Sequence, residues 1–393
     1  MSQETLKMSR KERDRALVME KVASGIMGIG EAAVKMNVSL RQAIRVKKRY
    51  LKHGEAGLVH RSRDRVSNHR LSSEVRRKAL ELYQTKYWDF GPTLASEKMA
   101  EFDHLVMHPE TLRLLLKRAL LWQGRGKELK HRKRRARRER FGELVQVDGS
   151  DHLWFELRGP RACLMVMVDD ATGRIMLHMA PGETTVAALM VLRKWVSRWG
   201  VPVDLYTDRK MVYFPPDGSK NETEFQQVTR RLGIGMIPAG SPQAKGRVEN
   251  RNKLLQDRLV KEFRLRGISN IDDANAMLDD FANEMNERFA VEAVLPCDAH
   301  RMISKRKDDL DSLFQIEYPR VVARDFTYSF EGRQWQILKQ SNLPAPGKRV
   351  SVCRRLDGTL LCTYQGRPLR VSHIAGQTNR SNVSSGSHKR SVA

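Results

Sequence analysis

The chain has 393 residues, 40% of them hydrophobic, and this length suits two to four domains, each with a core of its own. Lysine and arginine number 72 and aspartate and glutamate 46, so the formal net charge is +26 at pH 7. Like charges repel one another in a compact fold. The excess therefore indicates a polyanionic partner, with nucleic acid a better candidate than an anionic membrane surface.

The sequence shows no pattern typical of a membrane or secreted protein. No apolar run approaches the ~18 residues of a membrane span, and residues 1–15 lack the apolar core of a secretory signal. The four cysteines form no C-x-x-C pair, so neither a disulfide framework nor a zinc site is expected. We expect a cytoplasmic protein with no membrane partner.

Residues 1–53 predict a helix-turn-helix DNA-binding domain. Helices are expected over residues 10–24, 31–36 and 40–51, and Ser39 is a suitable N-cap for the third. The apolar residues expected to share one face of that helix are Leu40, Ala43, Ile44 and Leu51. The other face carries the predicted DNA contacts Arg41, Gln42, Arg45 and Lys48. The alternative is an ordinary helical bundle with a solvated basic face.

Two polar linkers flank the next predicted domain. Residues 54–70 are expected to be the first linker, and residues 71–122 a second helical DNA-binding domain in which Pro109 suits the start of a helix. Residues 123–140 hold ten Lys or Arg against two Glu, which predicts a basic linker, either solvated and disordered or ordered on DNA phosphates. Its predicted DNA contacts are Lys130, Arg132, Lys133, Arg134 and Arg135.

Residues 141–300 predict a mixed α/β sheet, because consecutive strands are followed by alternating helices and strands. Strands are expected over residues 144–147, 154–157, 164–168, 175–179, 204–207 and 235–237. Helices are expected over residues 184–199, 223–232 and 247–263. A further helix after Asp272 is expected to pack on this core through Ala274, Met277, Leu278, Phe281 and Met285.

The C-terminal part is predicted to be rich in β-structure. Apolar alternation through residues 318–373 and an Asp357-Gly358 hairpin signal favour a small β-barrel. Residues 374–393 are rich in Ser, Asn, Gly and basic residues, so we expect a disordered tail.

Three carboxylates lie where a mixed α/β sheet would bring them together. Asp148 ends one strand, Asp208 ends another 60 residues later, and Glu249 begins a helix after a further 41 residues. Clustered carboxylates repel one another unless a cation lies between them, and Mg²⁺ is a hard cation that prefers oxygen ligands. The pattern predicts a two-metal site for phosphodiester chemistry, occupied by Mg²⁺ or by Mn²⁺ in its place.

Each of these acids also has an ordinary explanation. An aspartate at a strand end is often a turn or cap residue, and a glutamate in the first turn of a helix is favoured by the helix dipole. The cations around Glu249 that suit a DNA clamp are Lys245, Arg247, Arg251 and Lys253. The rival acids are Asp151, Asp169 and Asp170, and for the last two a hairpin turn is favoured over a metal site.

Several segments together resemble the integrase-core transposases of bacterial insertion sequences, specifically the ISNCY-type group. They are QVDGSDHLWFELRGPR, MVDDATGR, YTDRK and SPQAKGRVEN followed by LQDRLVKE, with FGPTLASEKM, ETLRLLL and MNERFAVEA on either side. The resemblance covers nearly the whole chain, and the block around Glu249 is its most specific part. The chain departs from the pattern in a longer interval between Asp208 and Glu249, where residues 214–220 look like an insertion, and in Asp151 beside the first motif.

The resemblance implies a ribonuclease-H-like core whose Asp-Asp-Glu triad is Asp148, Asp208 and Glu249. It also implies two helical domains that bind the ends of the element, a C-terminal barrel, and a homo-multimer that pairs two ends. The implied reaction is Mg²⁺-dependent hydrolysis at the element's ends, followed by attack of the freed 3′-hydroxyls on target DNA without a covalent protein–DNA intermediate. The implied place of action is the bacterial cytoplasm, at the nucleoid.

Two other functions agree with part of the sequence. A non-catalytic, sequence-specific DNA-binding regulator would need the helix-turn-helix and the charge, but it would need no converging acids. A structure-selective nuclease of the same fold would need the acids, but not two N-terminal binding domains. The three carboxylates and the helical domains together favour a transposase.

The charge predicts a steep dependence of DNA binding on salt. If the protein contacts about eight phosphates, the logarithm of the binding constant should fall with the logarithm of salt concentration at a slope near about −7, because each contact releases condensed counterions. Fluorescence anisotropy with labelled duplex across a salt series measures this slope. A flat response would contradict the electrostatic argument.

Overall fold

The computed structural model describes residues 7–60, 70–124, 136–216, 219, 221–240, 246–303 and 307–374, with the side chains of residues 307–309 left out. The chain divides into two compact units, Met1–Arg125 and Gly126–Ala393. The predicted basic contacts at 130 and 132–135, Lys245 and the tail from residue 375 lie outside the described residues. In the part of the chain that is described, no helix is long and apolar enough to cross a membrane.

The predicted N-terminal helix-turn-helix is confirmed. Its helices are α1 (Arg10–Ala23), α2 (Ile29–Lys35) and α3 (Leu40–His53). Ser39 caps α3 by accepting a hydrogen bond from the backbone N–H of Gln42 at 3.3 Å. The turn before it places Asn37 at a φ of 53°, a left-handed conformation that asparagine tolerates better than most residues. The turn and the cap together fix where α3 begins.

The apolar face predicted for α3 is buried only in part. The residues of α3 that are buried are Ala43 and Val46, whereas Leu40, Ile44 and Leu51 are exposed. The helix repeat places these three on a neighbouring stripe that the small bundle does not cover. The spacing of apolar residues correctly placed Leu40, Ile44 and Leu51 on one stripe of the helix. It did not indicate which stripe faces the core of the bundle.

The first helical bundle also extends beyond its predicted end at residue 53. Residues Gly54–Leu58 form a 3₁₀ helix, η1, and Leu58 is buried in the bundle core. The buried carboxylate of Glu12 accepts a hydrogen bond from Ser9 N–H at the start of α1 and another, at 2.8 Å, from His60 N–H. The start of the predicted linker 54–70 is therefore part of the bundle.

The helices predicted over residues 71–122 are present. They are α4 (Ser73–Thr85), α5 (Pro92–Asp103) and α6 (Pro109–Arg118). Proline begins both α5 and α6, where its missing N–H removes no helical hydrogen bond. The Tyr83 hydroxyl donates to the Phe90 carbonyl at 2.9 Å and so connects α4 to the turn before α5.

A five-stranded mixed sheet forms the centre of the second unit, as predicted. Its strands are β1 (Leu144–His152), β2 (Ala162–Asp169), β3 (Ile175–Ala180), β4 (Asp204–Thr207) and β5 (Gly235–Pro238). Their order is β3-β2-β1-β4-β5, in which β1, β2 and β3 are antiparallel and β4 and β5 run parallel to β1. The order places β1 in the middle of the sheet, between the antiparallel and the parallel halves.

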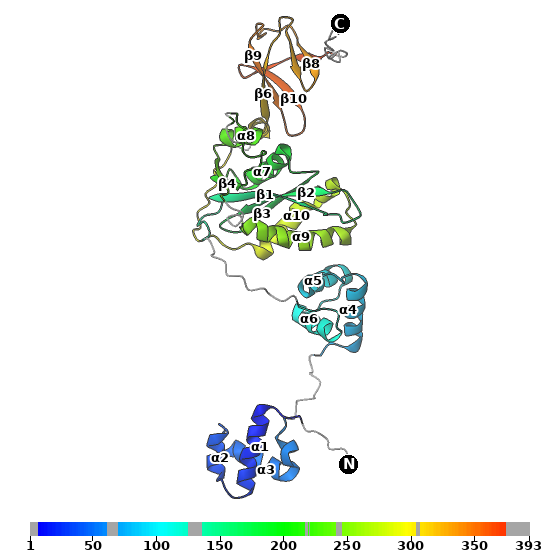
Figure 1. The fold of residues 1–393 in the computed structure, drawn as a ribbon, viewed down its shortest axis with the longest axis vertical. Coiled ribbons are helices and arrows are strands. Elements are labelled where there is room, and N and C mark those ends of the chain that lie inside the picture. The colour runs from blue at the N-terminus through cyan, green and yellow to red at the C-terminus, as the bar shows by residue number, and fades with distance from the viewer. Residues whose placement is uncertain are drawn as a thin grey trace, which may run out of the picture. The chain divides into compact units, whose positions relative to one another are not determined.

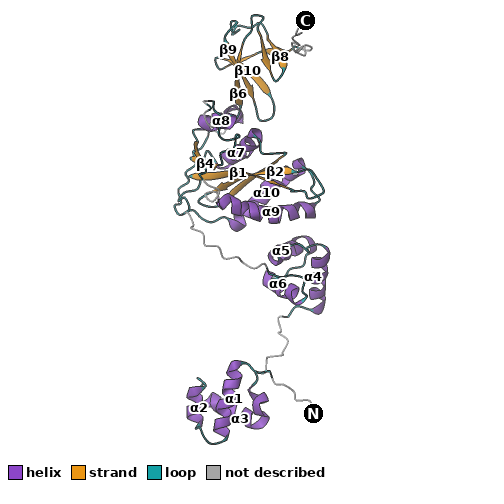
Figure 2. Ribbon diagram, in the orientation of Figure 1, coloured by secondary structure: helices purple, strands orange, loops and turns teal. Residues whose placement is uncertain are grey.

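Helices cover both faces of this sheet (Figures 1 and 2). One face packs against α7 (Thr185–Trp199) and α8 (Glu224–Leu232), and the other against α9 (Gly246–Arg266) and α10 (Ile271–Phe289). Side chains alternate along β1, so Val145 and Val147 join the α7 core while their neighbours face α9. The predicted packing face of α10 is confirmed: Ala274, Leu278, Phe281 and Met285 are buried and Met277 partly so.

The strand predicted over residues 154–157 is absent. Trp154 and Phe155 are fully buried, but the chain turns here, since Glu156 has a φ of 56° and its N–H donates to the Leu153 carbonyl. The indole N–H of Trp154 donates to the Ser150 carbonyl at 3.0 Å. A short aromatic run favoured a strand, whereas the aromatic rings here anchor a turn.

The C-terminal strands form two sheets rather than one closed barrel. The four-stranded sheet comprises β6 (Ile316–Val321), β9 (Arg349–Arg354), β10 (Leu360–Tyr364) and β11 (Arg367–Leu369). The three-stranded sheet comprises β7 (Thr327–Phe330), β8 (Arg333–Ile337) and β12 (Val371–His373). Both contribute to one apolar core. Strand β6 is an edge of its sheet, and Pro319 within it lacks the N–H that further pairing would use.

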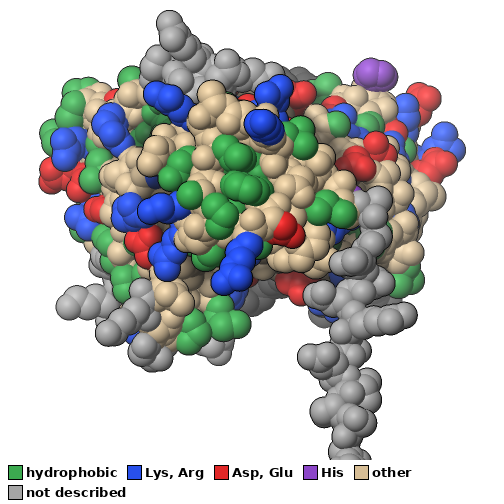
Figure 3. All heavy atoms as spheres, turned by 90° about the horizontal axis from the view of Figure 1, so that it is seen from above, with side chains coloured by type: hydrophobic (Ala, Val, Ile, Leu, Met, Phe, Trp, Pro, Cys, Tyr) green, Lys and Arg blue, Asp and Glu red, His purple; other side chains and the backbone are tan. Residues whose placement is uncertain are grey.

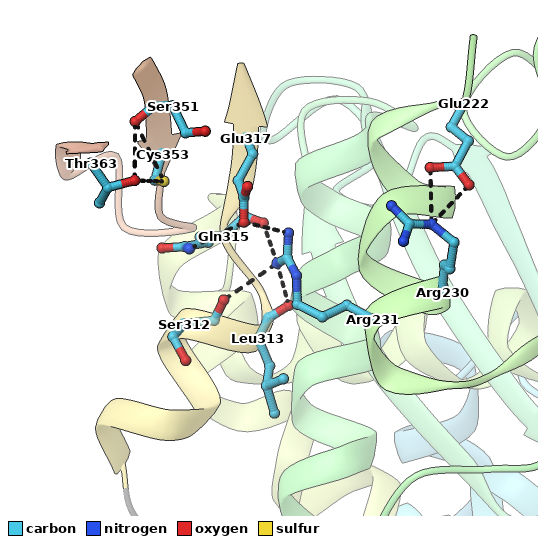
Figure 4. A network of polar contacts seen from close by, with 10 residues as sticks. All are labelled: Glu222, Arg230, Arg231, Ser312, Leu313, Gln315, Glu317, Ser351, Cys353 and Thr363. Carbon is cyan, nitrogen blue, oxygen red and sulfur yellow. Dashed lines mark hydrogen bonds and ion pairs between the residues drawn. The ribbon is translucent and has the colours of Figure 1, made fainter. Parts of the chain in front are cut away.

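Arg231 connects these strands to the α/β core. From α8 its guanidinium donates to the carbonyls of Leu313 and Gln315, each at 2.9 Å, and to Glu317 on β6 at 2.9 Å (Figure 4). Helix α11 (Lys307–Leu313) directly precedes β6. The Arg231 side chain therefore binds the segment that joins the α/β core to the C-terminal strands. Beside it on α8, Arg230 binds only Glu222 among the residues drawn.

We predict that Arg231→Ala lowers the free energy of unfolding by about 1–3 kcal/mol, because it leaves a carboxylate and carbonyls that are partly buried without their donor. Arg230→Ala is the matched control and should change it by at most about 1 kcal/mol, since its ion pair is exposed. Urea denaturation followed by tryptophan fluorescence measures both. Equal effects would contradict the role given to Arg231.

Candidate active site

Polar side chains connect β1 to α9 at regular intervals. Gln146 accepts from the Val248 N–H at 3.3 Å, Asp148 Oδ2 from Asn252 Nδ2 at 3.2 Å, and Ser150 Oγ from Gln256 Nε2 at 3.1 Å. Two strand residues advance about 6.6 Å and four helix residues about 6 Å, so the two repeats nearly match. We call these three contacts the polar ladder. The contact of Asp148 is the middle one, so the ladder holds this carboxylate against α9.

The pairing of β1 with β4 bears on how Asp148 and Asp208 lie. The paired residues run from Leu144 opposite Asp204 to Gln146 opposite Tyr206, an offset of 60 residues. The two aspartates are also 60 residues apart, and each lies two residues beyond the last pair, with Asp208 just past the end of β4. The register, if continued, predicts that they lie opposite each other. The Asp208 side chain is 27% exposed and contacts the ammonium of Lys210 at 3.2 Å.

Glu249 lies in the first turn of α9 and is half-buried. Its distance from the two aspartates therefore depends on where α9 begins. It precedes Asn252 by three residues, so both are on the same side of the helix, and Asn252 contacts Asp148. Within the described residues, no three His, Cys, Asp or Glu side chains come close enough together to hold a metal ion. Asp148 thus contacts α9 one helical turn after Glu249, Asp208 follows the strand that pairs with β1, and the grouping of all three as a metal site stays a prediction.

The rival acids have structural partners. Asp169 is buried, and its carboxylate accepts from Gly142 N–H and from the N–H and hydroxyl of Thr172. Burial raises the pKa of Asp169, and these hydrogen bonds oppose the rise. The residues from Asp169 to Gly173, with a φ of 73° at the glycine, form the turn that the sequence favoured. Asp151 is exposed and lies 3.6 Å from Arg161.

Asp170, named among the rival acids and assigned to a turn, also anchors the start of α9, which the sequence did not predict. Its fully buried carboxylate accepts from Arg247 Nε at 2.7 Å, from Gln146 Nε2 at 3.0 Å and from Arg138 N–H at 2.9 Å. Arg138 belongs to the predicted linker 123–140, so the end of that linker packs on the core. Arg247 follows Asp170 by 77 residues, so their pairing leaves no local pattern in the sequence.

The cations predicted around Glu249 differ in their surroundings. Arg247 binds Asp170, Arg251 donates to the Phe289 carbonyl at 2.8 Å, and Lys253 is exposed. Burial and the nearby Arg137 lower the pKa of Arg251. Their role in DNA contact stays a prediction.

A second acid outside the predicted set lies beside Asp208. Glu183 follows β3 and precedes Thr184, the N-cap of α7, and its carboxylate contacts Lys210 Nζ at 2.5 Å. Its position after a strand of the same sheet was the signal that the sequence offered. Lys210 therefore contacts Asp208 and Glu183 at once.

The predicted DNA-contacting residues of α3 lie at the surface of the first bundle. Arg41, Arg45 and Lys48 are exposed and Gln42 is half-buried. On the face of the molecule drawn in Figure 3, Lys and Arg side chains are interspersed with hydrophobic and acidic ones. The basic character of the chain is therefore not confined to α3.

Comparisons with known proteins agree on the class of protein. A family model described as a winged helix-turn helix matches residues 15–77. The chain is 37% identical over 384 residues to the Sinorhizobium fredii protein named "Putative transposase y4bF", which covers 94% of this chain and 84% of that protein. It is 28% identical over 321 residues to the transposase for insertion sequence IS1202 of Streptococcus pneumoniae, which covers 71% of this chain and 68% of that protein.

Solved structures with some likeness to this chain include two viral integrase assemblies. The HTLV-2 integrase catalytic core domain in complex with magnesium, in its dimeric form, is 18% identical with a TM-score of 0.32, over 41% of this chain and 98% of that chain. The simian T-cell lymphotropic virus intasome in complex with PP2A regulatory subunit B56 gamma is 14% identical with a TM-score of 0.34, over 75% and 99%.

We predict that Arg247→Ala destabilises the second unit by about 3–5 kcal/mol, because it removes the cation that faces a fully buried carboxylate. Lys253→Ala, six residues further along α9 and exposed, should leave the free energy of unfolding within about 0.5 kcal/mol of the wild type. Urea denaturation of the two variants tests this. An unchanged midpoint for Arg247→Ala would show that Asp170 does not depend on it.

Proposed function

This chain belongs to the transposase family that includes the Sinorhizobium fredii relative, and from that membership we propose that it cuts and joins DNA at a metal site formed by Asp148, Asp208 and Glu249. The proposed reaction hydrolyses phosphodiesters at the ends of an insertion sequence and transfers the freed 3′-hydroxyls to target DNA. The helix-turn-helix of the first unit is the proposed reader of the element's ends.

One observation carries the proposal: β1 and β4 pair as adjacent parallel strands with an offset of 60 residues, the same separation as Asp148 and Asp208. Continued by two residues, that register would set the two carboxylates side by side. A binding protein gains nothing from neighbouring carboxylates, since their charges repel each other, whereas a metal ion and a phosphate could use them. Asp148 lies in the middle of β1, not at its end as the sequence predicted, because β1 continues to His152, and Asp208 directly follows β4.

The residues around the pair fit a divalent metal. All three proposed ligands are carboxylates, the oxygen donors that Mg²⁺ and Mn²⁺ prefer. The ammonium of Lys210 lies 3.2 Å from Asp208, a contact that supports a cation site there. Next to Asp148, the buried Oδ1 of Asn252 has no hydrogen-bond partner, so a further oxygen is available on that side. A bound pair of metal ions would supply stabilisation of the attacking and leaving oxygens.

The protein's own part in the reaction is to hold these groups and to bring DNA to them. The polar ladder between β1 and α9 fixes Asp148 and the turn of α9 that carries Glu249. Exposed basic residues such as Arg41, Arg45 and Lys48 on α3 would neutralise or read the DNA. We propose that the protein acts as a homo-multimer that pairs two ends, on the DNA of the bacterial nucleoid.

We predict that Asp208→Asn lowers Mg²⁺-dependent nicking by about two to three orders of magnitude, the range for loss of one strong electrostatic stabiliser. The substrate is duplex DNA that carries the repeats flanking this gene. Asp148→Asn and Glu249→Gln should give losses of the same order. Asp151→Asn is the matched control, because Asp151 lies on the same strand but is exposed and paired with Arg161, and it should stay within about twofold of the wild type.

Other outcomes would select other functions. Binding of the repeats without nicking by any protein would favour a non-catalytic DNA-binding regulator. Nicking that ignores the repeats and never yields joined products would favour a structure-selective nuclease. Equal nicking by the wild type and Asp208→Asn would show that the carboxylates are wrongly assigned.

A further inference from the structure

Glu183 connects two parts of the sheet that carry the proposed metal ligands. Its side chain is 15% exposed and accepts two hydrogen bonds, from Lys210 Nζ at 2.5 Å and from the Tyr213 hydroxyl at 3.2 Å. Both donors belong to the segment that follows Asp208. Glu183 itself comes from the other side, at the end of β3 before α7.

Lys210 is shared between two carboxylates. Its ammonium lies 2.5 Å from Glu183 Oε2 and 3.2 Å from Asp208 Oδ2, and its backbone N–H donates to Asp208 Oδ1 at 3.3 Å. The shorter contact is the one to Glu183.

Gly149 leaves room for the Glu183 carboxylate against β1. A Cβ at this position would lie 2.6 Å from both Cδ and Oε2 of Glu183, far inside van der Waals contact. The φ of Gly149 is not in the left-handed region, so the glycine is needed for space rather than for conformation. Glu183 therefore packs on β1 one residue from Asp148, on the opposite face of the sheet from the Asp148 side chain, which contacts α9.

Tyr213 holds the other side of this arrangement. It is fully buried, and its ring packs edge-on against Phe225 with centroids 5.2 Å apart. Burial raises the pKa of Tyr213 far above its usual value, and the charges of Glu183, Asp208 and Asp148 raise it further. The hydroxyl therefore remains a donor, and it keeps the Glu183 carboxylate directed at Lys210.

We propose that Glu183 is a positioning residue that draws the Lys210 ammonium away from Asp208, so that a divalent metal can bind Asp208 without displacing a tightly held lysine. The proposal rests on the metal site proposed above. Lys210 neutralises part of the negative charge of the two acids. A divalent metal held by Asp208 would repel the ammonium, and Glu183 would retain it nearby.

The competition between Lys210 and the metal gives a sharp test. Glu183→Gln keeps the size of the side chain but removes its charge, so Lys210 should pair more strongly with Asp208. Mn²⁺ affinity of the full chain, measured by calorimetric titration without DNA, should then fall by about 10- to 100-fold, as for other residues that support metal ligands. The double variant Glu183→Gln/Lys210→Met should regain wild-type affinity or better, because the competing ammonium is gone.

A purely structural role for Glu183 would give a different result. The double variant would then bind Mn²⁺ as weakly as Glu183→Gln alone, and that outcome overturns the proposal, as does an unchanged affinity in Glu183→Gln. Gly149→Ala is a second variant that expels the carboxylate without changing any charge, and it should also weaken Mn²⁺ binding. Glu222→Gln, which removes an exposed acid paired with Arg230, is the matched control and should have no effect.

Asp208→Asn separates this proposal from the one on which it rests. If Asp208→Asn loses Mn²⁺ binding but Glu183→Gln does not, only the role of Glu183 is wrong. If Asp208→Asn binds Mn²⁺ like the wild type, the metal site itself is wrong and both proposals fall.

Discussion

The near match between the repeat of an α-helix and that of a β-strand is the constraint on which the site depends. Because α9 runs along β1 in the same direction, every fourth helix residue meets every second strand residue, and the three contacts from Gln146 to Gln256 follow. The buried Arg247–Asp170 pair fixes where this alignment begins. Once β1 and α9 are aligned, the positions of Asp148 and of the turn that carries Glu249 are no longer independent.

Negative charge gathers around Lys210. Its ammonium contacts the carboxylates of Asp208 and Glu183. The buried Asp169 carboxylate is held differently, by hydrogen bonds from Gly142 and Thr172. An ammonium on the flexible stem of a lysine can give way to another cation, whereas those donors are fixed by the backbone and a short side chain.

Much of the fold could be predicted because local signals determined it. Ser39, Thr184 and Thr223 each cap a helix that was expected to begin there, and β4 has the predicted bounds. Signals that depend on distant partners failed. The aromatic residues at 154 and 155 read as a strand because their burial in a turn depends on α9 and α10, and the apolar stripe of α3 could not show which side its bundle covers. Glu183 was missed because its importance comes from Lys210 and Gly149, far from it in sequence. The two C-terminal sheets were taken for a barrel because strand patterns do not show whether edges pair.

The two repeats along β1 and α9 are close but unequal, and the short strand keeps their difference small. Each step accumulates a mismatch of about 0.6 Å, so over the two steps from Gln146 to Ser150 the offset reaches only about 1.2 Å. Side chains absorb this offset, and the three contacts remain hydrogen bonds of 3.3, 3.2 and 3.1 Å. β1 ends at His152, so the polar contacts end with the strand. Asp148 occupies the central step, so a polar contact on either side limits how far its carboxylate can move along α9.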